Sequence, residues 1–336
     1  MKKVLVSGYI GFDNFGDEAI FYALSSHLKD KNFKVSVLCN NSLNVAQKYG
    51  VETFRYKNIF DILKAIISCD VLISGGGSLL QNKTSNFSLF YYLLIILFAK
   101  LFFKKVVIFA QGIEPINGKF PTFVTKNILK LVDFVSVRDK KSLEYLKTFN
   151  INSILVSDPA YSLAQDNKIN ENKTGLIVQL REFKGMNDEL IKNLAEVVSR
   201  KYQGEINVFS FQDKFDEKIC LKFIEELKKN NVQANYISQK SIKETLEVLN
   251  NAKYLISTRL HGLIIGNALK TSCFALCYDE KVKTLKEELN LQSIDINNYT
   301  KEELDNKLDA FFNHCLNEVH QYRRFEWDVI DNVLNK

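Results

Sequence analysis

Short apolar runs alternate with helical patterns along the whole chain, and this alternation constrains the fold more than any other feature. The first run, Lys3–Ser7, precedes a helical pattern over Asp17–Leu28, and the same succession repeats almost to the C-terminus. The runs are continuously apolar, as expected of strands in a sheet that is covered on both faces. Strands that alternate with helices form parallel sheets. The sequence therefore predicts an α/β fold.

Two series of strands are predicted, separated by a polar stretch. The first series comprises Lys3–Ser7, Lys34–Leu38, Val71–Ser74, Val106–Ala110, Phe134–Val137 and Ile154–Val156. The second comprises Gly175–Gln179, Asn207–Phe209, Ala234–Tyr236, Tyr254–Ser257 and Cys273–Tyr278. The stretch Gln165–Lys173 between them has the composition of a linker. A chain of 336 residues is long enough for two domains with separate cores.

We therefore predict a GT-B-like architecture of two Rossmann-like domains with a cleft between them. The domains are expected at residues 1–162 and 174–300, and helices over 301–336 are expected to pack back across them. Ligands of such folds bind at the carboxyl ends of the strands. The loops that follow the strands are thus the places where chemistry is expected.

The overall charge narrows the choice of partners. The net charge of +6 is modest, and acidic residues are interleaved with basic ones. The chain contains no dense block of Lys and Arg with aromatic residues between them, so we expect no nucleic-acid partner. A small basic excess suits an anionic substrate or weak attraction to an anionic membrane surface.

The cysteines and the N-terminus indicate a cytoplasmic protein. No C-x-x-C pair is present, and the N-terminal residues begin a strand rather than a signal peptide. Buried free thiols in a reducing compartment are expected for the six cysteines, Cys39, Cys69, Cys220, Cys273, Cys277 and Cys315.

One segment, Phe87–Ala99, is apolar at nearly every position. A membrane-spanning helix needs about 20 such residues, and Lys100, Lys104 and Lys105 interrupt the run before that length is reached. We expect a helix that packs between the sheet and a neighbouring element. The alternative is that one face of this helix rests on a membrane or on a lipid-linked substrate.

The motif Ser257-Thr258-Arg259-Leu260-His261-Gly262 follows a predicted buried strand and leads into an apolar helix. The free N–H groups and the dipole of a helix N-terminus favour an anion there. The arginine adds a planar cation suited to phosphate or carboxylate, and the histidine can move a proton near neutral pH. The motif therefore predicts anion capture beside an acid–base group. The alternative is a structural arginine with a hydrogen-bonded core histidine.

Loops of the first half carry further candidates. The loop after the first strand contains three glycines with Asp13 and Asp17, which suit hydroxyl binding or a general base better than phosphate binding. The alternative is a plain strand-to-helix junction. The strand that begins at Val71 is followed by a run of glycines that includes Gly76 and Gly77, and then by Ser78. This run predicts a backbone surface for a sugar or an anion.

Polar residues also end the next two predicted strands. Gln111 follows one of them, and Arg138 follows the other. Arg138 is expected to face the same ligand, and the alternative is a salt bridge to Asp139 or to a neighbouring helix. Lys281 lies one strand after the Arg–His motif, where it can reach an anion as a point charge.

Seven motifs taken together resemble the bacterial polysaccharide pyruvyl transferases, in particular their cell-wall members. In chain order they are G-Y-I-G-F-D-N-F-G-D-E-A-I, G-G-G-S-L-L-Q, Q-G-I-E-P, S-V-R-D-x-x-S, D-P-A, S-T-R-L-H-G and Y-D-E-K-V, and the resemblance covers about residues 3 to 290. It implies a GT-B-like fold and phosphoenolpyruvate as the donor. It further implies a 4,6-linked pyruvyl ketal on a β-N-acetylmannosamine of a lipid-linked cell-wall precursor, a ketal that S-layer-homology proteins bind.

The resemblance implies roles for particular residues. His261 is the expected acid–base group, Arg138 and Lys281 complete the catalytic set, and Arg259 with Leu260 holds phosphoenolpyruvate. With the loops above, the predicted substrate-binding residues are Arg259, Leu260, Asp13, Asp17, Gly76, Gly77, Ser78 and Gln111. No metal and no cofactor are expected. The partners are phosphoenolpyruvate and a lipid-linked saccharide, with peripheral contact to the inner face of the membrane as a further expectation.

Two other activities remain open from the sequence. A GT-B glycosyltransferase that uses a nucleotide sugar shares the architecture and the positively charged second half. A non-catalytic sugar- or anion-binding protein shares the binding residues without turnover. One scaffold hosts many activities, so the fold does not separate these alternatives.

Overall fold

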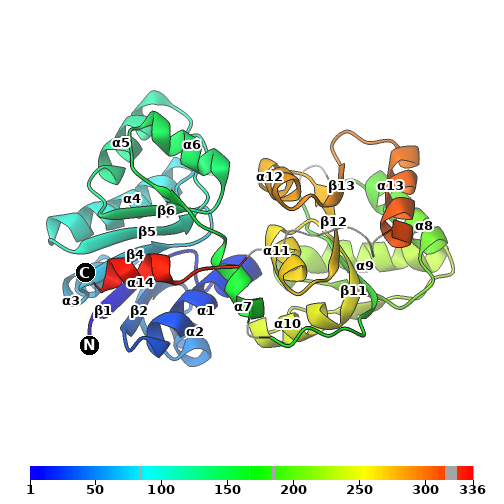
Figure 1. Ribbon diagram of the computed structural model, residues 1–336, viewed down its shortest axis with the longest axis horizontal. Coiled ribbons are helices and arrows are strands. Elements are labelled where there is room, and N and C mark those ends of the chain that lie inside the picture. The colour runs from blue at the N-terminus through cyan, green and yellow to red at the C-terminus, as the bar shows by residue number, and fades with distance from the viewer. Residues whose placement is uncertain (84, 166, 184–185, 315–323, 336) are drawn as a thin grey trace. The chain divides into compact units, whose positions relative to one another are not determined.

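The computed structural model describes residues 1–83, 85–165, 167–183, 186–314 and 324–335, and it shows two compact units (Figure 1). The first unit contains Met1–Ser162 together with the C-terminal segment from Phe325. The second unit contains Leu163–Arg324. Each unit has its own sheet and its own core.

The sheet of the first unit has seven parallel strands in the order β3-β2-β1-β4-β5-β6-β7. Its strands are β1 (Lys3–Ser7), β2 (Lys34–Cys39), β3 (Glu52–Arg55), β4 (Val71–Gly75), β5 (Lys105–Gln111), β6 (Phe134–Val137) and β7 (Ile154–Leu155). Successive strands are added on one side of β1 as far as β3 and then on the other side from β4 onward. This reversal lies between β1 and β4, and ligands of such sheets bind at the reversal, outside the carboxyl ends of the strands.

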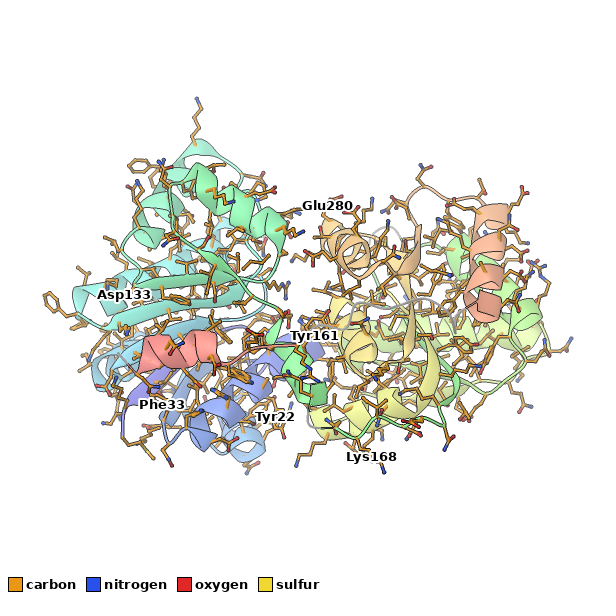
Figure 2. The ribbon with its side chains drawn as sticks, viewed as in Figure 1. Tyr22, Phe33, Asp133, Tyr161, Lys168 and Glu280 are labelled. Atoms are coloured by element: carbon orange, nitrogen blue, oxygen red, sulfur yellow. The ribbon has the colours of Figure 1, made fainter. Side chains whose placement is uncertain are left out.

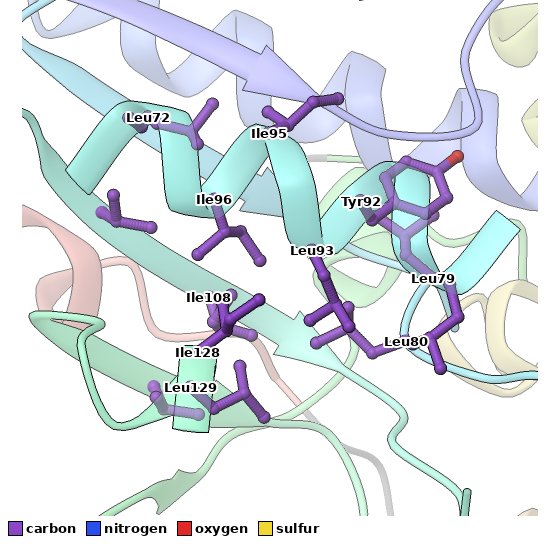
Figure 3. Close-up of a cluster of buried hydrophobic side chains, with 14 of the residues drawn as sticks. Leu72, Leu79, Leu80, Tyr92, Leu93, Ile95, Ile96, Ile108, Ile128 and Leu129 are labelled. Atoms are coloured by element: carbon purple, nitrogen blue, oxygen red, sulfur yellow. The ribbon is translucent and has the colours of Figure 1, made fainter. Parts of the chain in front are cut away.

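Helices cover both faces of this sheet. They are α1 (Phe15–Asp30), α2 (Ser42–Tyr49), α3 (Ile59–Ser68), α4 (Asn86–Leu101), α5 (Lys119–Leu129), α6 (Lys140–Thr148) and α14 (Asp328–Leu334), with a 3-10 turn η1 (Pro159–Tyr161). The short helix α7 (Ser162–Gln165) begins at the last residue of this unit and continues into the second. On one face, α3, α4 and α5 pack against alternate side chains of the central strands. Figure 3 shows Leu93 and Ile96 of α4 among Leu72, Ile108 and Ile128.

The opposite face carries α1 and the C-terminal helix α14 (Figure 1). Phe109 of β5 points to this face, where its ring lies 5.6 Å from that of Phe325 and 6.1 Å from that of Trp327. The Trp327 ring also stacks on His27 of α1 at 4.1 Å. The last residues of the chain therefore complete the core of the first unit.

The sheet of the second unit has six parallel strands in the order β10-β9-β8-β11-β12-β13, so its reversal lies between β8 and β11. The strands are β8 (Thr174–Gln179), β9 (Ile206–Phe209), β10 (Asn235–Ile237), β11 (Ala252–Ser257), β12 (Ser272–Cys277) and β13 (Gln292–Asp295). The helices are α8 (Asp188–Lys201), α9 (Asp213–Lys229), α10 (Ile242–Asn251), α11 (Leu260–Ala268), α12 (Glu280–Leu289) and α13 (Lys301–His314).

The predicted α/β fold with two Rossmann-like sheets is confirmed, and two details differ. The strands β3 and β13 were not predicted, because each is a four-residue edge strand with polar, partly exposed side chains. The helices predicted over 301–336 belong to different units: α13 packs in the core of the second unit, and α14 packs in the first. Residues 315–323 of that segment lie outside the described part of the chain.

Five cysteines are buried free thiols, and Cys315 lies outside the described residues. Burial raises the pKa of each of the Cys39, Cys69 and Cys277 thiols to about 11. Within the described part of the chain, none of the helices has the length and apolar character needed to cross a bilayer.

Candidate functional site

The Arg–His motif lies at the reversal point of the second sheet. Strand β11 ends at Ser257, and Arg259 is the extended N-cap residue of α11. The Arg259 N–H donates to the Gln179 side-chain oxygen at 3.0 Å and to Ser257 Oγ at 2.9 Å. A Cβ on Gly262 would lie only 2.8 Å from Ser257 Oγ, so glycine allows the first turn of α11 to approach the strand. Side chains of β8 and β11 therefore fix the start of α11.

The guanidinium of Arg259 is held in place by an aspartate of α9. Arg259 is 7% exposed, and its Nη2 lies 2.5 Å from Oδ1 of Asp216, which has no exposed surface. Burial raises the pKa of the Asp216 carboxyl and lowers the pKa of Arg259, and the attraction between the two opposes both shifts. Among the described residues, the buried Nε of Arg259 has no hydrogen-bond partner. The arginine is thus fixed in orientation with one donor unused.

His261 and Lys281 are placed at the ends of two neighbouring helices. His261 is the second residue of α11 and is half-buried. Lys281 is also half-buried and is the second residue of α12, whose first residue, Glu280, is labelled in Figure 2. Because β11 and β12 pair in parallel, the amino ends of both helices lie at the same edge of the sheet. Leu260, the first residue of α11, is half-buried between the arginine and the histidine.

A third cation, Arg181, lies at this edge and is not among the predicted site residues. It follows the end of β8, and its Nη1 donates to the hydroxyl of Tyr278 at 3.3 Å. Burial raises the pKa of that hydroxyl, and the positive charges of Arg181 and Arg259 oppose the shift. The signal available in the sequence was its position after a strand, the same signal that singled out Arg259.

In the first unit, Arg138 is the centre of a second polar group. It follows β6, is 9% exposed, and forms an ion pair of 2.7 Å with Asp158. Its Nη2 donates to Ser78 Oγ at 3.3 Å. A Cβ on Gly112 would lie 3.1 Å from its Nε, so the absence of a side chain there leaves room for the guanidinium. The ion pair is therefore with Asp158 and not with Asp139, which caps α6.

Packing against α1 explains the two glycines that precede Ser78. Gly76 and Gly77 have φ values of +61° and +67°, which side-chain-bearing residues rarely adopt. A Cβ on Gly76 would lie 2.1 Å from a methyl carbon of Ile20, and one on Gly77 would lie 2.4 Å from a carboxylate oxygen of Asp17. The structure therefore brings Asp17 against the glycine loop at the reversal between β1 and β4. The predicted contact of this loop with a substrate stays a prediction.

The other two predicted residues of this unit differ in exposure. Gln111 is fully buried, and its side-chain nitrogen donates to the backbone and hydroxyl oxygens of Ser74 at 3.0 and 2.8 Å. This position suits the ordering of the β4 and β5 loops better than direct contact with a ligand. Asp13 is exposed and adopts a left-handed backbone with φ of +58°, just before the N-cap of α1.

The predicted residues thus form two groups, one in each unit. The first contains Arg138, Ser78 and the glycine loop with Asp17, and the second contains Arg259, His261 and Lys281. Sequence reasoning missed the two buried aspartates, Asp158 and Asp216, because only tertiary packing distinguishes them from ordinary turn and helix-start residues.

Comparison with known proteins adds a family and a fold. The family profile described as polysaccharide pyruvyl transferase matches residues 14–280. No curated protein matches the chain significantly.

Solved structures resemble the chain over its full length. UDP-GlcNAc 2-epimerase from Methanocaldococcus jannaschii is 13% identical, with a TM-score of 0.68, 100% of this chain covered and 99% of that one. A putative UDP-N-acetylglucosamine 2-epimerase from Listeria monocytogenes is 10% identical, with a TM-score of 0.69 and coverage of 99% and 95%. MurG from Acinetobacter baumannii is 12% identical, with a TM-score of 0.59, and both chains are covered completely. At such identities the likeness establishes the GT-B fold alone.

Proposed function

This chain belongs to the polysaccharide pyruvyl transferase family, and we propose that it moves a pyruvyl group from phosphoenolpyruvate to a sugar of a polysaccharide precursor. The acceptor we propose is a β-N-acetylmannosamine of a lipid-linked secondary cell-wall precursor, on which a 4,6-linked ketal forms. Phosphate is the second product.

The observation that supports the choice of donor substrate is the buried Nε of Arg259, which has no hydrogen-bond partner among the described residues. Phosphoenolpyruvate has a phosphate and a carboxylate, so a site for it needs several cations and hydrogen-bond donors. The second unit offers Arg259, Arg181 and Lys281 at one edge of its sheet, together with the amino ends of α11 and α12. Because Asp216 fixes the guanidinium of Arg259, little conformational entropy is lost when an anion binds. We assign phosphoenolpyruvate to this edge.

His261 is the acid in the proposed mechanism. Its proton goes to the methylene carbon C3 of phosphoenolpyruvate, which leaves positive charge at C2. One sugar hydroxyl adds to C2 and loses its proton. The C2–O bond to phosphate then breaks, and the second hydroxyl adds to C2 and also loses its proton, which closes the ketal. The overall reaction converts phosphoenolpyruvate and a diol to a ketal and phosphate.

The first unit supplies the proposed acceptor residues. Asp17 lies against Gly77 at the reversal of the sheet and is half-buried, and Asp13 is exposed one turn earlier. A carboxylate accepts hydrogen bonds from sugar hydroxyls and can take a proton from one of them. We propose Asp17 as the base that activates the acceptor, with Asp13 and Ser78 as further contacts to the sugar. Arg138 is proposed to complete the catalytic set.

The test uses a substitution that keeps the charge and removes the planar fork. Arg259→Lys retains a cation beside Asp216, so the fold is expected to survive, but Nε and its fixed geometry are lost. We expect phosphate release from phosphoenolpyruvate, in the presence of a lipid-linked N-acetylmannosaminyl disaccharide, to fall by at least about tenfold. The matched control is Arg200→Lys, at an exposed ion pair with Asp305, which should leave the rate unchanged. Equal rates for both variants would contradict the assignment of Arg259.

The same assay separates the competing activities. A nucleotide-sugar glycosyltransferase would release UDP from a UDP-sugar and would be stabilised against heat by UDP rather than by phosphoenolpyruvate. A binding protein would be stabilised by its ligand without releasing phosphate. Phosphate release that requires both phosphoenolpyruvate and the acceptor is expected only of the proposed pyruvyl transferase.

A further inference from the structure

The outer side of α4 is apolar along most of its length. Phe87, Leu94 and Leu101 follow one another at seven-residue intervals, which places them on one side of the helix, and they are 80%, 47% and 61% exposed. The inner side of the same helix packs in the core of the first unit (Figure 3). A surface helix of a water-soluble domain normally carries charged and polar residues on its outer side. α4 carries no charged residue before Lys100, near its end.

The neighbouring helix α5 and the turn after α4 extend this apolar region. Phe120 and Phe123 of α5 are 68% and 65% exposed, and the Phe120 ring lies 6.0 Å from that of Phe90 on α4. Phe103 follows α4 with φ of +55° and is 95% exposed. We call this set the α4–α5 apolar surface, defined by Phe87, Leu94, Leu101, Phe103, Phe120 and Phe123. Exposed apolar groups gathered in this way mark interaction surfaces.

The segment that carries the α4–α5 apolar surface has a positive charge excess in its sequence. Residues 83–131 contain seven lysines and one acidic residue, Glu114, so this segment alone has a formal charge of +6, equal to that of the whole chain. Lys83 pairs with Glu114, and Lys100 pairs with Asp133, labelled in Figure 2. On α5 and at its end, Lys119 and Lys130 are exposed beside the phenylalanines.

We propose that the α4–α5 apolar surface docks on an anionic lipid membrane. Apolar side chains would enter the boundary between headgroups and acyl chains, and the lysines would contact anionic headgroups. A helix of 16 residues is shorter than the roughly 20 needed to span a bilayer, so α4 lies along the surface rather than across it. A second copy of the chain is the less favourable occupant, because a symmetric contact would bring the two sets of lysines together.

The position of the α4–α5 apolar surface also indicates where a lipid-linked acceptor would meet the first unit. α4 and α5 both begin after the carboxyl ends of strands, at the edge of the sheet that carries Ser78 and Arg138. A sugar attached to a membrane lipid would therefore be presented near this edge. This second step rests on the proposed function, whereas docking itself does not.

Vesicle flotation tests the docking. Wild-type protein is mixed with vesicles of phosphatidylcholine alone or of equal parts phosphatidylcholine and phosphatidylglycerol, without donor or acceptor. We expect binding to the anionic vesicles that decreases as salt is raised. Phe120→Ser with Phe123→Ser should weaken it by at least about tenfold. Phe215→Ser with Leu221→Ser, a control at exposed apolar positions of α9, should bind as the wild type does.

A charge series completes the experiment. Lys119→Gln, Lys126→Gln and Lys130→Gln should each weaken binding by about fivefold. The control substitutions Lys228→Gln, Lys240→Gln and Lys243→Gln each remove one charge from an exposed position of the second unit and should have little effect. The proposal is overturned if anionic vesicles bind no better than neutral ones, or if the controls weaken binding equally. It is also overturned if the phenylalanine variants instead convert a dimer to a monomer in sedimentation. None of these results would bear on phosphate release.

Discussion

At the residue scale, both candidate groups are built around a buried arginine that is paired with a buried aspartate. Arg138 pairs with Asp158 and Arg259 with Asp216, and none of the four is more than 9% exposed. A buried ion pair adds little net stability over an apolar pair of similar volume. Such a pair does fix the orientation of the arginine guanidinium. We infer that the aspartates position the arginines for an anionic ligand.

Replacement of Asp216 tests this arrangement through stability. Asp216→Asn leaves the guanidinium of Arg259 buried without a countercharge, so the free energy of unfolding should fall by about 3–5 kcal/mol. Asp305→Asn weakens the partly exposed pairs with Arg200 and Lys201 and should cost less than about 1 kcal/mol. Urea unfolding of both variants gives the comparison. Similar losses in the two variants would mean that Asp216 does not compensate a buried charge.

His27 in the first unit provides the control for substitution of His261 in the second. His261→Ala should reduce turnover by at least about a hundredfold while the protein remains folded, because the proposed proton donor is lost. His27→Ala removes a contact of 2.7 Å between its Nε2 and Oδ1 of Asp331 and should lower stability without changing turnover per folded molecule. Initial rates measure the turnover of both variants, and circular dichroism spectra show whether they are folded. Near-normal turnover of His261→Ala would exclude it as the acid.

Some site residues could be predicted from sequence and others could not, for a physical reason. Arg138 and Arg259 each follow an apolar run, and the end of a strand is visible in the sequence. Asp216 lies among the polar residues at the start of a helix, where acids are common, and only the folded chain shows that it is buried.

At the element scale, the buried central strands were all predicted, because their continuous apolar runs are unambiguous, and the edge strands β7 and β10 were predicted as well. The edge strands β3 and β13 are short and partly exposed, so their sequences differ little from those of loops. The glycine loop after β4 was predicted as a binding surface. Its packing against α1 explains Gly76 and Gly77 without a ligand, and no sequence pattern distinguishes these two causes.

Gly50 and Gly76 have the same backbone conformation, so comparing their substitutions distinguishes the cost of backbone strain from the cost of steric overlap. Gly50 has φ of +60°, and a Cβ added there would have nothing within 4 Å, so Gly50→Ala should cost about 1–2 kcal/mol from the left-handed backbone alone. Gly76 has φ of +61°, and a Cβ there meets Ile20 at 2.1 Å. Gly76→Ala should therefore cost at least about 2 kcal/mol more. Chemical unfolding of both variants measures the difference, and equal costs would contradict the close packing of this loop on α1.

At the scale of the whole molecule, the chain leaves the first unit after residue 162 and returns to it at Phe325. The amphipathic pattern of the C-terminal residues predicts helices but does not reveal which unit each helix joins. Leu304, Leu308 and Phe311 of α13 lie in the core of the second unit, whereas Phe325 lies against Phe109 in the first. Only long-range packing distinguishes them.

Two buried phenylalanines report on this division. Phe325→Ala should destabilise the first unit, and Phe311→Ala should destabilise the second, each by about 3–5 kcal/mol. Trp327 is the single tryptophan of the chain and lies in the first unit, so its fluorescence follows that unit. Phe325→Ala should lower the urea midpoint seen by fluorescence, and Phe311→Ala should leave it in place. An equal shift in both variants would contradict the assignment of the C-terminal helix to the first unit.

The fate of the donor's carbon atoms tests the proposed activity most directly. Wild-type protein is incubated with a lipid-linked N-acetylmannosaminyl disaccharide and phosphoenolpyruvate labelled with carbon-13 at C2, and the product is examined by NMR and mass spectrometry. We expect the label to appear on the sugar as a ketal carbon bonded to two oxygens of the same residue, with one phosphate released for each ketal. An unlabelled acceptor, or label on the acceptor in a form other than a ketal, would contradict pyruvyl transfer.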